Sequence, residues 1–341
     1  MTCCLFFTMV KGQTTILIRH ADKDTAYIRE YYRKHFIVRA YELTKFNNFK
    51  LIDGPDRLLF KPNDHNNIGV GFIYRFISLN LGFYVPFIDK NRDIYGKTRD
   101  LDLQSHLYVD RFIVDIYGQF YHGYYLSNAG SSIDNFPGHV LVRPDISTRN
   151  LSMTVQYVYN DKRFSYNAPF YQNERQKKSA GSLLIGGGIY HFNSSADSAF
   201  TPVNTRYSDF FNNYRFNTTG NTGIGLNAGY AYTGVIKKWF YITGMLGGGA
   251  GINRAELGDT YTGQTMEKVG PELTITGKLA LGYNSDKYFA GVTYTRLITE
   301  NNGVAPDTWQ EVNSGNFRFT VAERFRLKKS LIPKSDLIKI E

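Results

Sequence analysis

The sequence predicts an all-β protein, a closed antiparallel transmembrane β-barrel of about 14 strands. Three observations lead to this prediction. Apolar and polar residues alternate with period two in many segments, these segments are about 10 to 15 residues long, and short connections alternate with long ones. The 341 residues include 26 Tyr, 25 Phe and 32 Gly, which argues against a coiled coil or a helical bundle.

The alternating segments follow one another along most of the chain. Clear alternation occurs at about 35–46, 68–76, 79–85, 101–107, 112–120, 151–157, 179–193, 219–234, 273–281 and 317–327. One face of each segment is apolar and aromatic, whereas the other carries Gly, Ser, Thr, Asn, Gln and charged residues. A tilted strand needs roughly 9 to 11 residues to cross a membrane, and soluble strands usually have about 5 or 6. The segment lengths therefore favour a membrane barrel over a soluble sandwich.

The connections provide the strand count. Tight turns are expected near 75–77, 108–111, 160–162, 234–237 and 284–287, and long loops near 47–66, 87–97, 127–148, 252–268 and 300–314. Outer-membrane barrels have short periplasmic turns and long extracellular loops. If the strand at about 35–46 leaves the periplasm, the alternation holds only with an added short strand at about 198–204. The total is then about 14, with both termini in the periplasm; about 12 is the alternative, if 35–46 and 198–204 both lie outside the wall.

The apolar faces of these strands are expected to contact lipid. The lipid-facing residues that we predict are Val70, Phe72, Leu103, Val114, Ile116, Val155 and Ile275.

The segment 100–125 carries the best polar candidate site. We expect Leu107 to pair with Phe112 across a tight turn, so that the polar residues of the two strands face one another. Gln104 then faces Asp115, Asp102 faces Tyr117, Asp100 faces Gln119, and His106 lies nearby. The predicted lumen-facing cluster is therefore Asp100, Asp102, Gln104, His106, Asp115, Tyr117 and Gln119. Such a cluster either stiffens the wall by hydrogen bonding or contacts a ligand or a cation.

No sequence motif indicates catalysis. Barrel lipid hydrolases carry a His-x-Ser motif, and none of the seven histidines has a serine two residues later. Ser105 and His106 are adjacent, so their side chains point to opposite faces of a strand. The glycine triplets at 186–188 and 247–249 lack the context of a phosphate-binding loop. We therefore expect no catalytic residue, no metal and no cofactor, and a pore, a transporter or a structural wall protein. A membrane-embedded enzyme acting on lipid or lipopolysaccharide is the alternative.

The chain ends and the charge indicate where the protein acts. Residues 1–13 resemble part of a signal peptide and contain both cysteines, Cys3 and Cys4. We expect a periplasmic segment at 14–34, the barrel at 35–328 and a basic tail at 329–341. The net charge is +10, but Lys and Arg are spread along the chain, which argues against nucleic-acid binding. The expected location is the outer membrane of a Gram-negative bacterium. The expected partners are its lipids and lipopolysaccharide, the barrel-assembly machinery during insertion, and possible small solutes.

Two long motifs add a family resemblance. One is GKTRDLDLQSHLY at 96–108, continued by DIYGQFYHGYY at 115–125, and the other is RFSYNAPF at 163–170, continued to 182. Over about 27–327 the chain resembles an uncharacterised Bacteroidota family, catalogued as domain of unknown function 4421. The resemblance implies an outer-membrane β-barrel. It implies no activity, so it assigns no catalytic residue.

Overall fold

The computed structural model describes residues 23–31, 35–63, 66–74, 77–84, 91–109, 111–207 and 209–327. The predicted signal segment 1–13, with Cys3 and Cys4, and the predicted basic tail 329–341 lie outside the described residues. None of the helices in the described ranges is long and apolar enough to cross a membrane.

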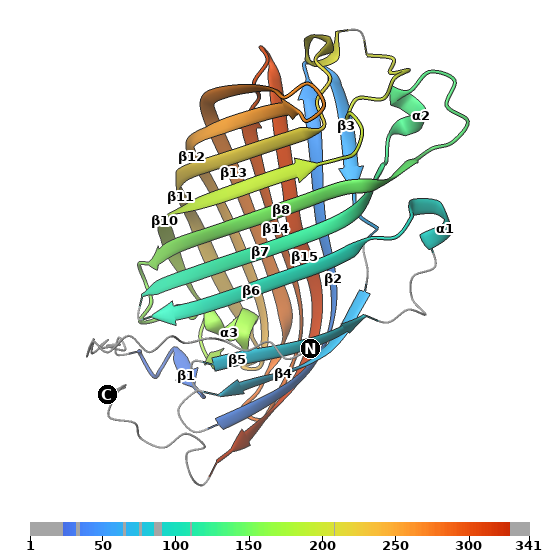
Figure 1. The fold of residues 1–341 in the computed structure, drawn as a ribbon. Coiled ribbons are helices and arrows are strands. Elements are labelled where there is room, and N and C mark those ends of the chain that lie inside the picture. The colour runs from blue at the N-terminus through green and yellow to red at the C-terminus, as the bar shows by residue number, and fades with distance from the viewer. Residues whose placement is uncertain are drawn as a thin grey trace, which may run out of the picture.

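The fold is an antiparallel sheet of 13 strands that curls into a barrel (Figure 1). Its strands are β2 (His35–Asp53), β3 (Asp56–Lys61), β4 (Asn66–Tyr74), β5 (Ile77–Tyr84), β6 (Arg99–Val109), β7 (Phe112–Leu126), β8 (Leu141–Val158), β10 (Ala180–Ser195), β11 (Thr218–Ile236), β12 (Phe240–Asp259), β13 (Gln264–Asn284), β14 (Tyr288–Asn302) and β15 (Thr308–Arg326). A separate sheet pairs β1 (Ile28–Glu30) with β9 (Glu174–Gln176). The short helices are α1 (Arg92–Tyr95), α2 (Ala129–Ser132), α3 (Asn167–Tyr171) and the 3-10 helix η2 (Phe210–Asn213).

Ten of these strands form the closed ring, in the order β15, β14, β13, β12, β11, β10, β8, β7, β3 and β2, with β2 returning to β15. The predicted count of about 14 is wrong. The expected strand at 198–204 does not form, because this segment belongs to a loop whose Phe200 is completely buried. The condition for 12 strands is not met either, since β2 covers 35–46 and lies in the wall.

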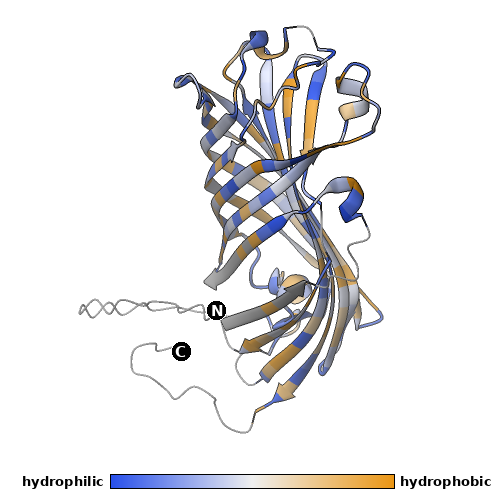
Figure 2. Ribbon diagram, turned by 45° about the vertical axis from the view of Figure 1, so that its right-hand side comes forward, coloured by the Kyte–Doolittle hydropathy of each residue, from blue (hydrophilic) through white to orange (hydrophobic). Residues whose placement is uncertain are grey.

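The ring closes through a short contact. β3 pairs with β7 at only two positions, Phe60 with Leu126 and Lys61 with Tyr125. Toward its N-terminal end, β2 pairs with β4 and no longer with β3. β4 in turn pairs with β5, and β6 pairs with β7. Within the described residues β5 and β6 do not pair with each other, and Figures 1 and 2 show their ribbons apart. Two sheet edges therefore face each other in this half of the wall.

The hairpin of β6 and β7 differs in register from the prediction. Val109 pairs with Phe112, so Leu107 pairs with Val114 and not with Phe112. The turn is tighter than expected, with only positions 110 and 111 between the strands. Since the shift is two residues and the side-chain period is also two, each residue keeps its predicted face.

As predicted, one end of the barrel has short connections and the other has long loops, but some of the predicted connections are wrong. Short connections at 237–239 and 285–287 define the short-turn end, and loops at 127–140 and 196–217 define the long-loop end. Four predicted connections are wrong. The predicted long loops at 47–66 and 300–314 are mostly strand, because β2, β3, β14 and β15 extend into them. The predicted tight turn at 160–162 instead begins a 21-residue connection, 159–179, between β8 and β10, and the predicted long loop at 252–268 is mostly strand.

Apolar side chains cover the outer face of the sheet. On β13, Leu273, Ile275, Leu279 and Leu281 are exposed, while Lys278 and Ala280 between them are buried. Figure 2 shows the same alternation of apolar and polar residues along the other strands. This period of two places one apolar face outside the barrel and a mixed polar face inside.

Candidate functional site

The connection 159–179 folds into the short-turn end of the barrel, where Figure 1 shows α3; we call these residues the inner plug. Phe164 and Tyr166 of the plug are buried against inward-facing residues of five strands, including Ile113 and Met245. On the other side of this end, Phe170 packs against Ile37, Tyr241, Ala280, Phe289 and Ala322. Among the described residues, side chains from nearly the whole circumference thus contact the plug. It therefore fills this end of the barrel.

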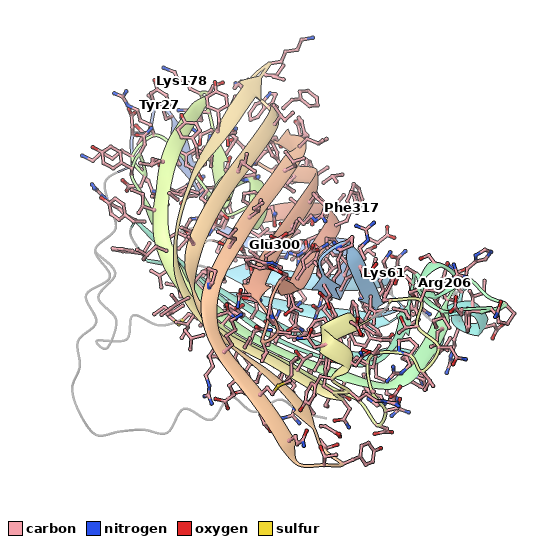
Figure 3. All side chains as sticks on the ribbon, turned by 90° about the horizontal axis from the view of Figure 1, so that it is seen from above. Tyr27, Lys61, Lys178, Arg206, Glu300 and Phe317 are labelled. Carbon is pink, nitrogen blue, oxygen red and sulfur yellow. The ribbon has the colours of Figure 1, made fainter. Side chains whose placement is uncertain are left out.

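The sheet of β1 and β9 attaches the N-terminal segment to the plug. Ile28 pairs with Gln176 and Glu30 with Glu174. Figure 3 shows Tyr27 beside Lys178, whose ammonium group lies 5.4 Å from the ring centroid of Tyr27. Of the predicted periplasmic segment 14–34, the part described, 23–31, thus packs against the plug.

Two buried arginines of the wall hold the plug at Gln172. Arg324 donates to the Gln172 carbonyl from Nε at 3.0 Å and from Nη2 at 2.7 Å. Arg39 donates from Nη1 to Oε1 of Gln172 at 3.0 Å. Both arginines are only 3% exposed, so these charge-assisted hydrogen bonds form away from water.

The ring of Tyr31, the residue that follows β1, packs against the guanidinium group of Arg324. The Arg324 guanidinium lies 4.2 Å from the Tyr31 ring centroid. Burial raises the pKa of Tyr31 to about 12, so the hydroxyl stays protonated. It donates to Oδ1 of Asp286 at 2.8 Å, which ties the N-terminal segment to the turn between β13 and β14.

An aromatic cluster fills the barrel toward the long-loop end. At its centre, Phe49 stacks on Phe60 with ring centroids 4.9 Å apart, and Phe192 and Phe200 lie within 6 Å of Phe49. The loop 196–217 contributes four of its residues. The cluster includes Phe49, Leu51, Leu58, Phe60, Tyr124, Leu126, Phe192, Phe200, Phe210, Phe211, Phe216, Leu257 and Val312. This second apolar layer separates the interior from the long-loop end.

A polar central cavity of about 130 Å³ lies between the plug and the aromatic cluster. Most of the residues that line it have polar side chains, and they come from strands β7 round to β15. The polar lining comprises Asp115, Tyr117, Gln119, Asn150, Ser152, Thr154, Gln156, Tyr190, Asn227, Glu272, Thr274, Thr276, Lys278, Thr295, Thr299, Ser314 and Asn316. A larger hollow, of about 650 Å³, is apolar and lies along the outer face of the same strands. Of these two hollows, the central cavity is the one lined mainly by residues with polar side chains.

One ion pair connects the cavity wall to the plug. Nζ of Lys278 lies 3.6 Å from Oδ2 of Asp115 and donates to the Tyr166 hydroxyl of the plug at 2.6 Å. All three residues are at most 8% exposed. Lys278 is therefore neutralised by Asp115 inside the barrel.

The structure divides the predicted lumen-facing cluster. Asp115, Tyr117 and Gln119 line the central cavity, and Gln119 accepts a hydrogen bond from Asn150 at 3.0 Å. Asp100 is exposed. The side chains of Asp102, Gln104 and His106 lie outside the described part, although the backbone pairs them with Gln119, Tyr117 and Asp115.

The predicted lipid-facing residues lie on the described strands as follows. Val70, Leu103, Ile116 and Ile275 are 39–55% exposed. Phe72, Val114 and Val155 are half-buried.

Sequence reasoning missed most of the cavity. The alternation at 273–281 places Lys278 on the polar face of its strand, but it does not single out Glu272 or Tyr190. The row of Glu272, Thr274, Thr276 and Lys278 at every second position is the signal that could have found Glu272. No group of three His, Cys, Asp or Glu side chains that could hold a metal occurs in the described ranges.

Comparison with known proteins identifies a family but no activity. The family described as a domain of unknown function (DUF4421) matches residues 22–325. No curated protein matches the chain.

Several solved barrels are similar in architecture. The outer membrane protease OmpT from Escherichia coli is 9% identical, with 85% of this chain and 97% of that chain covered and a TM-score of 0.41. The translocator domain of the autotransporter NalP from Neisseria meningitidis is 10% identical over 84% and 88% of the two chains, with a TM-score of 0.31. The toluene transporter TodX from P. putida is 5% identical over 86% and 91%, with a TM-score of 0.24. No role is carried over from these similarities.

We predict that Arg324→Met loosens the plug. The change removes two charge-assisted hydrogen bonds to the Gln172 carbonyl, each worth about 1.5–3 kcal/mol. Trypsin should then cleave after Arg175, which is 3% exposed in the intact plug, at least tenfold faster. Arg326→Met, at an exposed position two residues later, is the control. Equal cleavage rates in the two variants would show that Arg324 does not hold the plug.

Proposed function

We propose, from the premise that this chain belongs to the DUF4421 family, that it is an outer-membrane barrel that holds a small polar solute. The solute occupies the central cavity. The protein is a non-enzymatic binding or gated transport protein, and it is not an open diffusion pore.

The position of the central cavity carries this proposal. A diffusion pore needs a continuous polar lumen. Here a polar cavity of about 130 Å³ lies between two apolar layers, the inner plug and the aromatic cluster. A purely structural wall protein needs no such cavity. The arrangement supports an enclosed solute site that becomes accessible only when one of the two layers moves.

The outer surface supports the membrane location. Exposed apolar residues cover the outer faces of β11 to β13, where Leu226 and Leu246 are 77% and 69% exposed. Large exposed apolar surfaces of this kind mark a lipid-facing wall. The short-turn end then faces the periplasm and the long-loop end faces outside. The predicted lipid-facing residues, Ile116 among them, lie within this apolar belt in our proposal.

Substitution in the belt tests the lipid contact. We expect Ile116→Arg to cost roughly 2–4 kcal/mol of unfolding free energy in lipid vesicles, because an arginine near the bilayer midplane is poorly solvated. His191→Arg is the control. His191 also lies on the outer face, but its position is already polar, with the Thr222 hydroxyl 2.8 Å from Nδ1, so this change should cost about 0–1 kcal/mol. Urea titrations of the refolded barrels measure both values. Equal costs would argue against lipid at Ile116.

Conductance in planar bilayers tests the closed lumen. The wild type should give no steady channels. Residues 163–178 can be replaced by a short Gly/Ser linker, because Asn160 already donates to the Gly181 carbonyl at 2.8 Å. Residues 197–216 can be replaced likewise, because the Ala196 amide donates to the Asn217 carbonyl at 2.8 Å.

Each single replacement should remain silent, because the other apolar layer still seals the barrel. The double replacement should conduct, because a polar-lined path through the described part of the barrel is then continuous. Steady channels in the wild type would overturn the proposal and restore the open pore.

The second candidate function, an enzyme acting on lipid, rests on one contact. Nδ1 of His122 and Oγ of Ser147 lie 2.8 Å apart on the exposed outer face of β7 and β8. A serine activated by a histidine is a common hydrolytic pair. Against this function, no hydrogen bond between the other ring nitrogen of His122 and the described residues orients the ring.

Phospholipid hydrolysis by reconstituted protein distinguishes this candidate. On our proposal the wild type releases no fatty acid. If the wild type releases fatty acid, and if Ser147→Ala abolishes this release whereas Thr222→Ala does not, the protein is an enzyme. Thr222 is a suitable control because its hydroxyl makes the same 2.8 Å contact with Nδ1 of His191.

A further inference from the structure

Glu272 is a buried carboxylate in the wall of the central cavity. It lies on the inner face of β13 and is 3% exposed. Its Oε2 atom has no hydrogen-bond partner among the described residues, and the carboxylate makes no ion pair with them. A buried charge without a partner is costly, by several kcal/mol or more. An unfilled requirement of this size indicates a missing cationic or donor group.

The charge balance of the cavity leaves Glu272 alone. The one lysine in the lining, Lys278, is already paired with Asp115 at 3.6 Å. Lys278 lies six residues from Glu272 on the same strand, a separation of about 20 Å at the usual rise of 3.3–3.4 Å per residue. When Glu272 is ionised, the described lining therefore carries one net negative charge, located at this residue.

Two unsatisfied donor groups lie on the two strands that follow β13 in the sheet. Glu272 pairs across strands with Asn301, which pairs in turn with Gln310. The amide nitrogens of Asn301 and Gln310 are buried without a partner in the described structure. Tyr190 donates its hydroxyl to Oδ1 of Asn301. Unsatisfied donors and an unsatisfied acceptor thus occur on neighbouring strands, although buried polar groups usually have hydrogen-bond partners.

A glycine provides the space for Glu272 and for an aromatic ring. A Cβ atom at Gly223 would collide both with Oε2 of Glu272 and with Cε1 of Tyr190. The carboxylate and the Tyr190 ring therefore meet over this glycine. A carboxylate next to the face or edge of a tyrosine ring suits an organic cation, which gains from both.

We propose that the central cavity binds a small hydroxylated ammonium ion, with Glu272 as its counterion; this rests on the proposed solute-holding function. Hydroxyl groups of the ligand would bond to the lining threonines, among them Thr274 and Thr299. A divalent metal does not fit, because it requires more anionic oxygen ligands than one free carboxylate supplies. A cavity needs roughly 10–15 Å³ to hold one water, so about 130 Å³ suits a molecule of several heavy atoms better than a bare ion.

Calorimetric titration of the detergent-purified full chain tests the proposal. Ethanolammonium chloride is the probe, ethylene glycol is the uncharged analogue of similar size, and potassium chloride represents an inorganic cation. Glu272→Gln keeps the size of the side chain and removes the charge. Glu300→Gln is the matched control, because Glu300 precedes Asn301 on β14 and faces the opposite side of the sheet.

The wild type and Glu300→Gln should bind ethanolammonium at one site, and Glu272→Gln should bind it at least tenfold more weakly. Ethylene glycol should not bind. Glu272→Gln should keep the heat-resistant migration of the folded barrel on unboiled gels, because it removes an unpaired buried charge. The combination of retained folding and lost binding separates a ligand role from a structural one.

Three results would overturn the proposal: no ethanolammonium binding by the wild type, equal binding by Glu272→Gln, or displacement by an equal concentration of potassium, which would identify an inorganic cation. Loss of heat-resistant migration in Glu272→Gln would assign the carboxylate to folding instead. These results are independent of the bilayer measurements. Steady wild-type conductance would overturn the closed lumen and leave the calorimetric result standing.

Discussion

The carbonyl group of Gln172, bound by Arg324 inside the barrel, is the contact on which the interior depends. Two guanidinium nitrogens of Arg324 reach this oxygen, while Arg39 binds the side chain of the same glutamine. Gln172 ends α3 with a positive φ of 59°, which turns its carbonyl toward the wall. Buried arginines need acceptors, and buried loop carbonyls need donors. Each requirement is met by the other, so a 21-residue connection can stay inside a barrel.

The plug in turn gives the interior its layered order. Apolar residues of the plug pack against inward-facing apolar residues near the short-turn end, and the aromatic cluster does the same toward the long-loop end. Polar side chains are left for the middle, where Asp115 and Lys278 neutralise each other. Inward-facing glycines of β11 and β12, such as Gly225 and Gly251, face each other across these strands and leave room in this layer. The cavity is thus a consequence of where side chains are small and where they are polar.

The wall is less uniform than its interior. β11 and β12 pair over nineteen positions, from Thr218 with Gly258 to Ile236 with Phe240, whereas β3 and β7 close the ring through two. Sheet edges are costly in hydrocarbon because their amide and carbonyl groups lack partners. The half of the wall that carries β4, β5 and β6 therefore differs in stability from the half that carries β11 to β13. The cavity lining comes from the well-paired half, which provides a rigid support for Glu272 and Tyr190.

The sequence alone determined the class of fold and the face of each residue. Period-two alternation depends only on local backbone geometry, so it assigned Ile275 outward and Asp115 inward, and even the two-residue register error in the hairpin of β6 and β7 kept the faces. The tertiary structure decided the rest. A tight turn and a plug can both start near Asn160. Contacts with residues more than a hundred positions away, such as Arg324 and Lys278, select the plug. Glu272 and Tyr190 meet because β10 to β13 are neighbours in a closed sheet, and His122 meets Ser147 by pairing across β7 and β8. Such meetings depend on which strands pair and in what register, and alternation along a single strand carries no information about either.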